Sequence, residues 1–258
     1  MLKKRLIGVV TIYQGRAVQS IGYCRYLPMG KPEILIENLD RWGADEILIQ
    51  CIDRSLEQAG PDLALLKRIG ALGLSTPLIY AGGIRNAEDA VKVVSLGADR
   101  ISVDSMLWDS PWHLEKISRE LGTQALIVNM PVRVGGNYFY WRNYRAQQEV
   151  YLDEEILAKL PFEWASEVML TDWVHDGVAN SFDPRLLEFF PLTKKPLIAF
   201  GGLSEYSQLQ DVLAKSNVVA AGIGNFLAYK EHAIQQLKRQ MIGTPIRPAQ
   251  YAQEGYEL

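Results

Sequence analysis

The sequence has few cysteines and histidines, no long apolar run and no excess of basic charge. Two cysteines and three histidines among 258 residues show no metal-ligand spacing and no disulfide framework. We therefore expect no metal, no cofactor and a reducing, cytoplasmic location. The longest apolar stretches are far shorter than the roughly 20 residues of a membrane helix, and the run after the basic start is too short for a signal peptide. With a net charge of −3 and scattered Lys and Arg, no basic stripe for nucleic acid is present.

Short β-branched runs alternate with helical patterns along the whole chain. Hydrophobic residues make up 48% of the sequence, and near-continuous apolar runs are typical of strands covered on both faces. Eight such runs occur, at 5–12, 46–53, 77–84, 100–105, 125–132, 167–174, 196–203 and 218–225. Amphipathic segments predict helices at 87–98, 111–121 and 204–214, with Asn86, Ser110 and Ser204 as N-caps. Eight βα units predict one (βα)8 TIM barrel domain over 1–258, with a doubly wound sheet as the alternative.

The chain also repeats itself. Residues 46–62 align with residues 167–183 at a constant offset, which matches Glu46 with Glu167. The stretch "AGGI" at 81–84 is echoed by "FGGL" at 200–203. A half-barrel that was duplicated and fused predicts this pattern, whereas the alternative is that any two βα units look alike.

Two glycine pairs, Gly82–Gly83 and Gly201–Gly202, follow predicted strands at the end of a barrel where ligands bind. Glycine lets backbone N–H groups approach an anion, and a following helix N-terminus adds partial positive charge. Other small or polar residues follow strands at the same end, namely Asp104, Ser105, Gly224 and Asn225. These positions predict two phosphate sites on opposite sides of the mouth, or simply tight turns.

Several separated stretches resemble one known family. They are "RLI" and "GRAVQS" within 5–20, "ADEILI" (44–49), "AGGIRNAEDA" (81–90), "SLGADRISVDS" (95–105), "GTQALIV" (122–128), "SEVMLTDWVHDG" (166–177) and "PLIAFGGL" (196–203). Together they resemble HisF, the cyclase subunit of imidazole glycerol phosphate synthase, over essentially the whole chain. The resemblance implies a glutaminase partner at the N-terminal barrel face, whose ammonia travels through the barrel to a phosphorylated substrate at the other mouth.

The resemblance also implies an ammonia gate, a ring of four charged residues at the lower barrel end. Its positions fall on Arg5, Glu46, Arg100 and Glu167, and Asp99 matches an aspartate at the glutaminase contact. Alternating charges at a barrel end also neutralise one another as a structural plug, so the sequence leaves both interpretations open.

The acids that do the family's proton transfer are replaced. Their positions at the ends of strands one and five fall on Thr11 and Pro131, and neither side chain exchanges a proton as a carboxylate does. The family's loop lysine falls on Gln19 and a further acid falls on Cys51. Substitution at all four positions predicts that the usual cyclisation is absent.

Other titratable residues remain near the predicted mouth. The acids are Asp53, Asp104, Asp172 and Asp176. The resemblance places Asp176–Gly177 at a phosphate, and His175 beside it titrates in the useful range. Asp53, His175 and Asp176 are the candidate catalytic residues, with a surface role as the alternative for His175.

The segment 134–152 is dense in aromatics and alternates like a hairpin over the mouth. Tyr138, Tyr140, Trp141 and Tyr144 either stack on a ring of a ligand or pack the hairpin onto the barrel.

Three functions fit these observations. The first is a synthase-type subunit of a glutamine amidotransferase complex that delivers ammonia to a phosphorylated or nucleotide-sugar acceptor, since relatives of the family are associated with amidino modification of surface sugars. The second is the histidine-pathway cyclase. The third is a non-catalytic scaffold that binds phosphate or conducts ammonia to a third, acceptor enzyme.

Overall fold

Eight parallel strands close into a barrel in the computed structural model, which describes residues 3–136, 138–188, 190, 195–241 and 243–250. The ring runs through β1 (Arg5–Tyr13), β4 (Glu46–Cys51), β5 (Leu78–Ala81), β6 (Arg100–Val103), β7 (Leu126–Gly135), β10 (Glu167–Asp172), β11 (Leu197–Phe200) and β12 (Val218–Ile223). Pairings of β12 with β1 and of β7 with β10 complete the closure. The (βα)8 prediction is confirmed.

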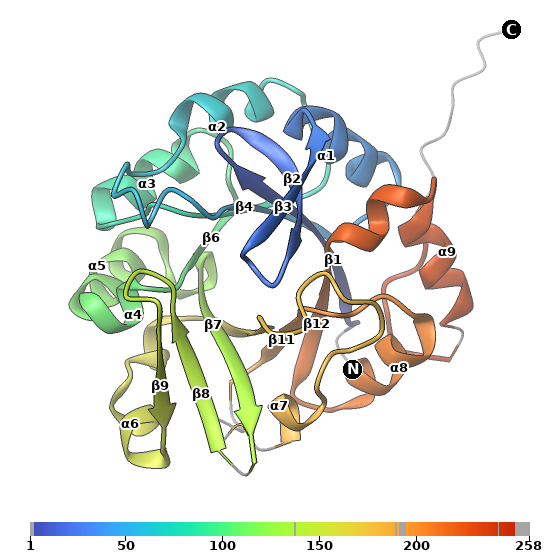
Figure 1. Ribbon diagram of the computed structural model, residues 1–258. Helices are drawn as coiled ribbons and strands as arrows, with labels where there is room; N and C mark the ends of the chain where they lie inside the picture. Colours follow the sequence, from blue (N-terminus) through green and yellow to red (C-terminus); the bar gives the residue numbers. More distant parts are fainter. Residues whose placement is uncertain (1–2, 137, 189, 191–194, 242, 251–258) are drawn as a thin grey trace, which may run out of the picture.

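Helices surround the ring (Figure 1). They are α1 (Pro32–Arg41), α2 (Leu63–Gly70), α3 (Ala87–Ser95), α4 (Met106–Asp109), α5 (Trp112–Leu121), α6 (Glu154–Lys159), α7 (Arg185–Glu188), α8 (Tyr206–Ala214) and α9 (Ala233–Gln240). Short 3-10 turns occur at η1 (Thr123–Ala125), η2 (Phe162–Trp164) and η3 (Asn225–Tyr229). Within the part of the chain that the structure describes, no helix is long and apolar enough to cross a membrane.

Strand alternation builds two apolar layers. On β1, Leu6, Val10 and Ile12 pack outward against the helices, whereas Ile7 and Val9 face the barrel interior. The interior core also contains one or two residues from most of the other strands: Leu48, Ile79, Ala81, Ile127, Met169, Ile198, Phe200 and Ala220. This side-chain layer fills the middle of the barrel.

Only one of the three predicted N-caps is confirmed. The Asn86 side chain accepts a hydrogen bond from the Asp89 amide at the start of α3. Ser110 is wrong because α5 starts after Pro111, and Ser204 is wrong because its hydroxyl accepts from the Asn180 amide in a neighbouring loop. A serine hydroxyl can also accept hydrogen bonds from amides outside its own helix, as the Ser204 hydroxyl does.

Two β-hairpins extend from the C-terminal end of the barrel. The hairpin of β8 (Tyr138–Asn143) and β9 (Gln148–Leu152) confirms the prediction for 134–152, of which Asn137 lies outside the described residues. The hairpin of β2 (Arg16–Ile21) and β3 (Arg25–Gly30) was not predicted, and it lies near the centre of the ring in Figure 1. Both hairpins therefore shape the mouth.

The two halves of the barrel hold their glycine pairs in matching surroundings. Gly82 and Gly201 have positive φ angles of 122° and 100°. A Cβ on Gly82 would lie 2.1 Å from the Cys51 carbonyl oxygen, and one on Gly201 would lie 2.4 Å from the Asp172 carbonyl oxygen. Cys51 and Asp172 are themselves equivalent in the repeat, so the geometry supports the duplicated half-barrel.

Candidate active site

Four charged side chains form a closed ring at the N-terminal end of the barrel. Arg5 lies 3.3 Å from Glu46 and 2.8 Å from Glu167. Arg100 lies 3.2 Å from Glu46 and 3.0 Å from Glu167. Each residue is the first of its strand, so strands β1, β4, β6 and β10 bring together the four positions that the resemblance implies.

The ring is nearly buried and its charges depend on one another. Burial opposes the charge on Arg5, but Glu46 and Glu167 outweigh that effect and raise the pKa of the guanidinium. Burial also raises the pKa of Glu46, although both arginines lower it. Among the described atoms, Glu46 Oε2 is buried without a hydrogen-bond partner. Nearby Asp99 remains exposed, and its carboxylate accepts a hydrogen bond from the Leu78 amide.

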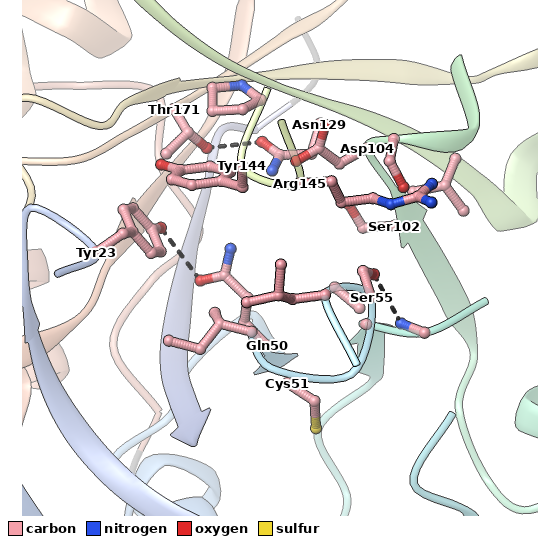
Figure 2. Close-up of a pocket in the computed structure, with 18 of the residues that line it drawn as sticks. Tyr23, Gln50, Cys51, Ser55, Ser102, Asp104, Asn129, Tyr144, Arg145 and Thr171 are labelled. Atoms are coloured by element: carbon pink, nitrogen blue, oxygen red, sulfur yellow. Dashed lines mark hydrogen bonds between the residues drawn. The ribbon is translucent and has the colours of Figure 1, made fainter. Parts of the chain in front are cut away.

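A cavity of about 160 Å³, here called the mouth cavity, lies at the opposite end. It opens over the C-terminal ends of β4, β5, β6 and β7, and the β8–β9 hairpin forms one wall. Its polar lining residues include Tyr23, Gln50, Ser55, Ser102, Asp104, Ser105, Asn129, Tyr144, Arg145 and Thr171 (Figure 2). This arrangement suits a small polar ligand held by several hydrogen bonds.

Hydrogen bonds hold the floor and walls of the mouth cavity. Thr171 Oγ1 donates to Asn129 Oδ1 at 2.7 Å, and the Tyr23 hydroxyl donates to Gln50 Oε1 at 3.2 Å (Figure 2). The Gly83 amide donates to Ser55 Oγ at 3.1 Å. Two lining residues, in contrast, carry buried polar atoms without a partner among the described residues: Ser102 Oγ and Tyr144 OH. Unpartnered buried groups are costly and are common where a ligand completes them.

Asp104 is the one carboxylate among the residues described as lining the mouth cavity. Burial raises its pKa to about 7, against a smaller opposing effect of the Trp141 indole. A carboxyl group with such a pKa gives and takes protons near neutral pH. Asp104 therefore has the chemistry that Thr11 and Pro131 lack.

Thr11 and Pro131 occupy different surroundings. Pro131 lines the mouth cavity. Thr11 is buried and lines a separate cavity with Met29 and Gly224, although its neighbour across the sheet is Gln50. No carboxylate stands at either position.

Cys51 and Asp53 do not reach into the mouth cavity with their side chains. The Cys51 sulfur belongs to the outer core, and Figure 2 shows it pointing away from the other labelled side chains. Burial raises the pKa of this thiol to about 12. The Asp53 carboxylate accepts a 2.8 Å hydrogen bond from the Gln14 amide and so holds the turn between β1 and β2.

His175 lies outside the residues that line the mouth cavity. Its Nδ1 is 2.7 Å from Asp172 Oδ2, which also accepts from the Asp183 amide at 2.8 Å. Burial raises the pKa of Asp172, against the effects of Asp183 and His175. This network orders the loop after β10.

The two predicted phosphate sites differ in the space they offer. Gly82, Gly83 and Ser105 line the mouth cavity. The other six candidates line one small cavity of about 10 Å³: Asp176, Gly177, Gly201, Gly202, Gly224 and Asn225. Burial raises the pKa of Asp176 to about 6, although the Ser20 hydroxyl lowers it through a hydrogen bond. The first group therefore borders the mouth cavity, whereas in the second group only Gly224 and Asn225 also line a larger cavity, the one that contains Thr11.

The aromatic side chains of the β8–β9 hairpin lie in two different places. Trp141 and Tyr144 line the mouth cavity. Trp141 stacks on Trp108 with ring centroids 4.3 Å apart. Tyr138 and Tyr140 instead pack edge-on against Tyr151 on the neighbouring strand.

Sequence reasoning missed the polar residues on the inner face of the strands. Gln50, Asn129 and Thr171 each follow an inward apolar residue by two positions, so strand alternation alone contained the signal. Tyr23 had no such signal, because its position depends on the unpredicted β2–β3 hairpin.

Comparisons with known proteins agree with this geometry. Residues 5–233 match the family model described as "Histidine biosynthesis protein". The chain is 29% identical over 248 residues to the imidazole glycerol phosphate synthase subunit HisF of Cytophaga hutchinsonii, covering 95% of this chain and 98% of the relative. It is 28% identical to HisF of Lactococcus lactis subsp. cremoris, covering 95% and 96%, and 28% identical to HisF of Thermococcus gammatolerans, covering 96% and 99%.

A closed (βα)8 barrel with a polar mouth defines the class of this protein. The chain belongs to the histidine biosynthesis protein family, and its relatives are HisF subunits of imidazole glycerol phosphate synthase.

Proposed function

We propose that this chain is the synthase-type subunit of a glutamine amidotransferase complex, in which ammonia from a glutaminase partner reaches an acceptor in the mouth cavity. The proposal rests on one observation: a charged ring and a polar cavity lie at opposite ends of the same barrel. The ring of Arg5, Glu46, Arg100 and Glu167 closes the lower end, and a polar cavity lies at the upper end.

Ammonia entry requires the ring to open. Each arginine contacts both glutamates, so turning one guanidinium aside leaves each glutamate paired with the other arginine. A glutaminase docked at this face, beside the exposed Asp99, would supply new partners for the displaced guanidinium. Exchange of partners keeps the cost of desolvated charge low.

Asp104 is the residue we assign to proton transfer at the mouth. The lone pair of ammonia forms a bond to an electrophilic carbon of the acceptor, and an electron pair of the carbon–oxygen bond moves to oxygen. The excess proton on nitrogen passes to the Asp104 carboxylate and from there to that oxygen, which restores the carboxylate. Asp53, Asp172 and Asp176 are each engaged by hydrogen bonds within the chain.

The acceptor in this proposal is a phosphorylated small molecule or nucleotide sugar, as in amidino-sugar biosynthesis for surface polysaccharides. Trp141 and Tyr144 supply aromatic surface for a sugar or base, and Gly83 and Ser105 lie where a phosphate would bind.

Reconstitution with a HisH-type glutaminase tests the proposal. We expect the two proteins to co-purify and glutamine hydrolysis to rise when this chain is added. Glu167→Gln, which changes the ring and leaves the mouth intact, should alter that stimulation, whereas the exposed Glu155→Gln in α6 should not. Absence of both co-purification and stimulation would contradict the proposal.

The names of the relatives favour a second candidate, the histidine-pathway cyclase. Complementation of a histidine auxotroph that lacks its cyclase tests it directly. We expect no growth with this chain, because Thr11 and Pro131 replace the family's acids. Growth would establish the cyclase instead, and a complex that stimulates glutaminase without turning over any acceptor would favour the scaffold.

A further inference from the structure

The two equivalent halves of the mouth differ in the size of the cavity that their glycine pairs border. In the first half, Gly82–Gly83 and Ser105 border the mouth cavity of about 160 Å³. In the second half, Gly177 and Gly201–Gly202 border a cavity of only about 10 Å³. Because the glycine backbones match, a neighbouring segment must account for the difference.

The segment Ser20–Tyr23, at the turn of the β2–β3 hairpin, fills the second half. The Ser20 hydroxyl donates to Asp176 Oδ2 at 2.6 Å, and the Gly22 amide donates to the Asp176 carbonyl at 3.0 Å. Asn225 Nδ2 donates to the Ser20 carbonyl at 2.6 Å. The side chains of Ser20, Asp176 and Asn225 are therefore engaged within the chain.

Close backbone contact shows that the segment Ser20–Tyr23 packs directly against Gly177. A Cβ on Gly177 would lie 2.4 Å from the Ser20 carbonyl oxygen and 3.0 Å from Ile21 Cα. The residues described as lining the small cavity include neither lysine nor arginine. An anion placed there would find no cationic side chain among them.

The first half has the opposite charge. A recess of about 220 Å³, here called the arginine recess, adjoins the mouth cavity and shares Ser55, Gly83, Ser105 and Arg145 with it. Its wall contains Arg54, Arg85 and Arg145, with Asp109 as the one acid among the described lining residues.

Arg54 brings to the recess a positive charge that pairs with no carboxylate of the described residues. Its guanidinium donates to the carbonyls of Gly60, Ala59 and Pro61 at 2.7, 3.0 and 3.4 Å. Arg85 and Arg145, by contrast, pair with Asp89 and Asp109. A phosphate oxygen in the recess would gain charge-assisted hydrogen bonds, which are the strong ones.

We propose that the acceptor carries a single anionic group of the phosphate type, bound in the arginine recess, while its uncharged reacting end lies beside Asp104. The segment Ser20–Tyr23 takes the place of a second phosphate and so selects against a ligand that is phosphorylated at both ends. This inference rests on the proposed function for the role of Asp104, but the anion site stands on its own geometry.

Titration with inorganic phosphate, followed by amide resonances of the full chain, tests the site. We expect saturable binding of one phosphate, with shifts at Gly83 and Ser105 and none at Gly177 and Gly202. Arg54→Gln and Arg145→Gln should each weaken binding about tenfold, since each removes a charged donor. Arg119→Gln, in an exposed pair on α5, should leave binding unchanged.

A matched pair of ligands tests the selectivity. Glucose 1-phosphate should bind at least as tightly as glucose 1,6-bisphosphate. The inference is overturned by two phosphates per chain, by shifts centred on Gly177 and Gly202, by arginine variants that bind like wild type, by tighter binding of the bisphosphate, or by no saturable binding. These measurements need no glutaminase, so failure here and failure of the proposed function are distinguishable.

Discussion

The rings of Tyr23 and Tyr144 meet over the barrel mouth with their centroids 5.4 Å apart and their planes inclined by 56°. Tyr23 comes from the turn of the β2–β3 hairpin and Tyr144 from the turn of the β8–β9 hairpin. Burial raises the pKa of both phenols well above the usual range. The contact joins two hairpins that are distant in the sequence, and both residues line the mouth cavity.

Removing the Tyr144 ring should release the β2–β3 turn. We expect Tyr144→Ala to cost roughly 2 kcal/mol of unfolding free energy and to speed amide exchange at Gly22 and Tyr23. Tyr138→Ala, at a more exposed position of the same hairpin, is the matched control and should cost less than about 1 kcal/mol. Unchanged exchange at the turn in Tyr144→Ala would show that the contact does not hold it.

The charged ring should be sensitive to the loss of one cation. Arg5→Met leaves Glu46 and Glu167 close together with only Arg100 between them, so we expect urea denaturation at pH 7 to show a loss of about 3 kcal/mol. Lower pH should recover part of the loss as the glutamates are neutralised. Arg119→Met removes an exposed ion pair and should cost less than about 0.5 kcal/mol. Equal effects of the two variants would contradict this account.

The raised pKa of Asp104 predicts a specific pH dependence of stability. Its folded pKa of about 7 lies above the ordinary 3.8, so the folded state binds a proton more tightly than the unfolded state. This residue therefore opposes folding above pH 7, and stability rises as the pH falls from about 7 to about 4. Asp104→Asn removes a penalty of at most roughly 4 kcal/mol at pH 8.

The measurement for Asp104 is the difference in unfolding free energy between wild type and Asp104→Asn across that pH range. Burial also raises the pKa of Asp176, but Asp176 is present in both proteins, so its own pH dependence cancels in the difference. A difference that does not vary with pH would rule out the raised pKa.

The matching glycines should respond alike to substitution. Gly82→Ala and Gly201→Ala each place a methyl group within 2.4 Å of a backbone carbonyl at positive φ, so we expect losses of at least about 3 kcal/mol or failure to fold. Gly136→Ala also has positive φ but meets nothing within 4 Å, and it should lose only about 1 kcal/mol. Thermal unfolding of the three variants checks this. Tolerance of alanine at Gly201 would contradict the equivalence of the two halves.

From the sequence alone, the strand and helix patterns predicted the barrel and the glycine pairs at its mouth, and the resemblance to a known family supplied the four positions of the charged ring. These features lie at regular places on the strands, as for Arg5 and Glu167 at the first positions of β1 and β10. Parallel strands in a closed barrel bring such ends together whatever the loops do. The alternation of aromatic and polar residues also predicted the hairpin over 134–152, because this alternation is a local signal.

The packing of distant segments settles which acid faces the mouth cavity and which glycine pair borders it. Asp53, Asp104 and Asp176 are alike in sequence as acids near strand ends, yet only Asp104 lines the mouth cavity. The difference arises from partners far along the chain, since Asp176 is held by Ser20 and Asp53 by Gln14. Contacts between distant loops depend on how those loops pack in three dimensions, and no periodicity in the sequence records them.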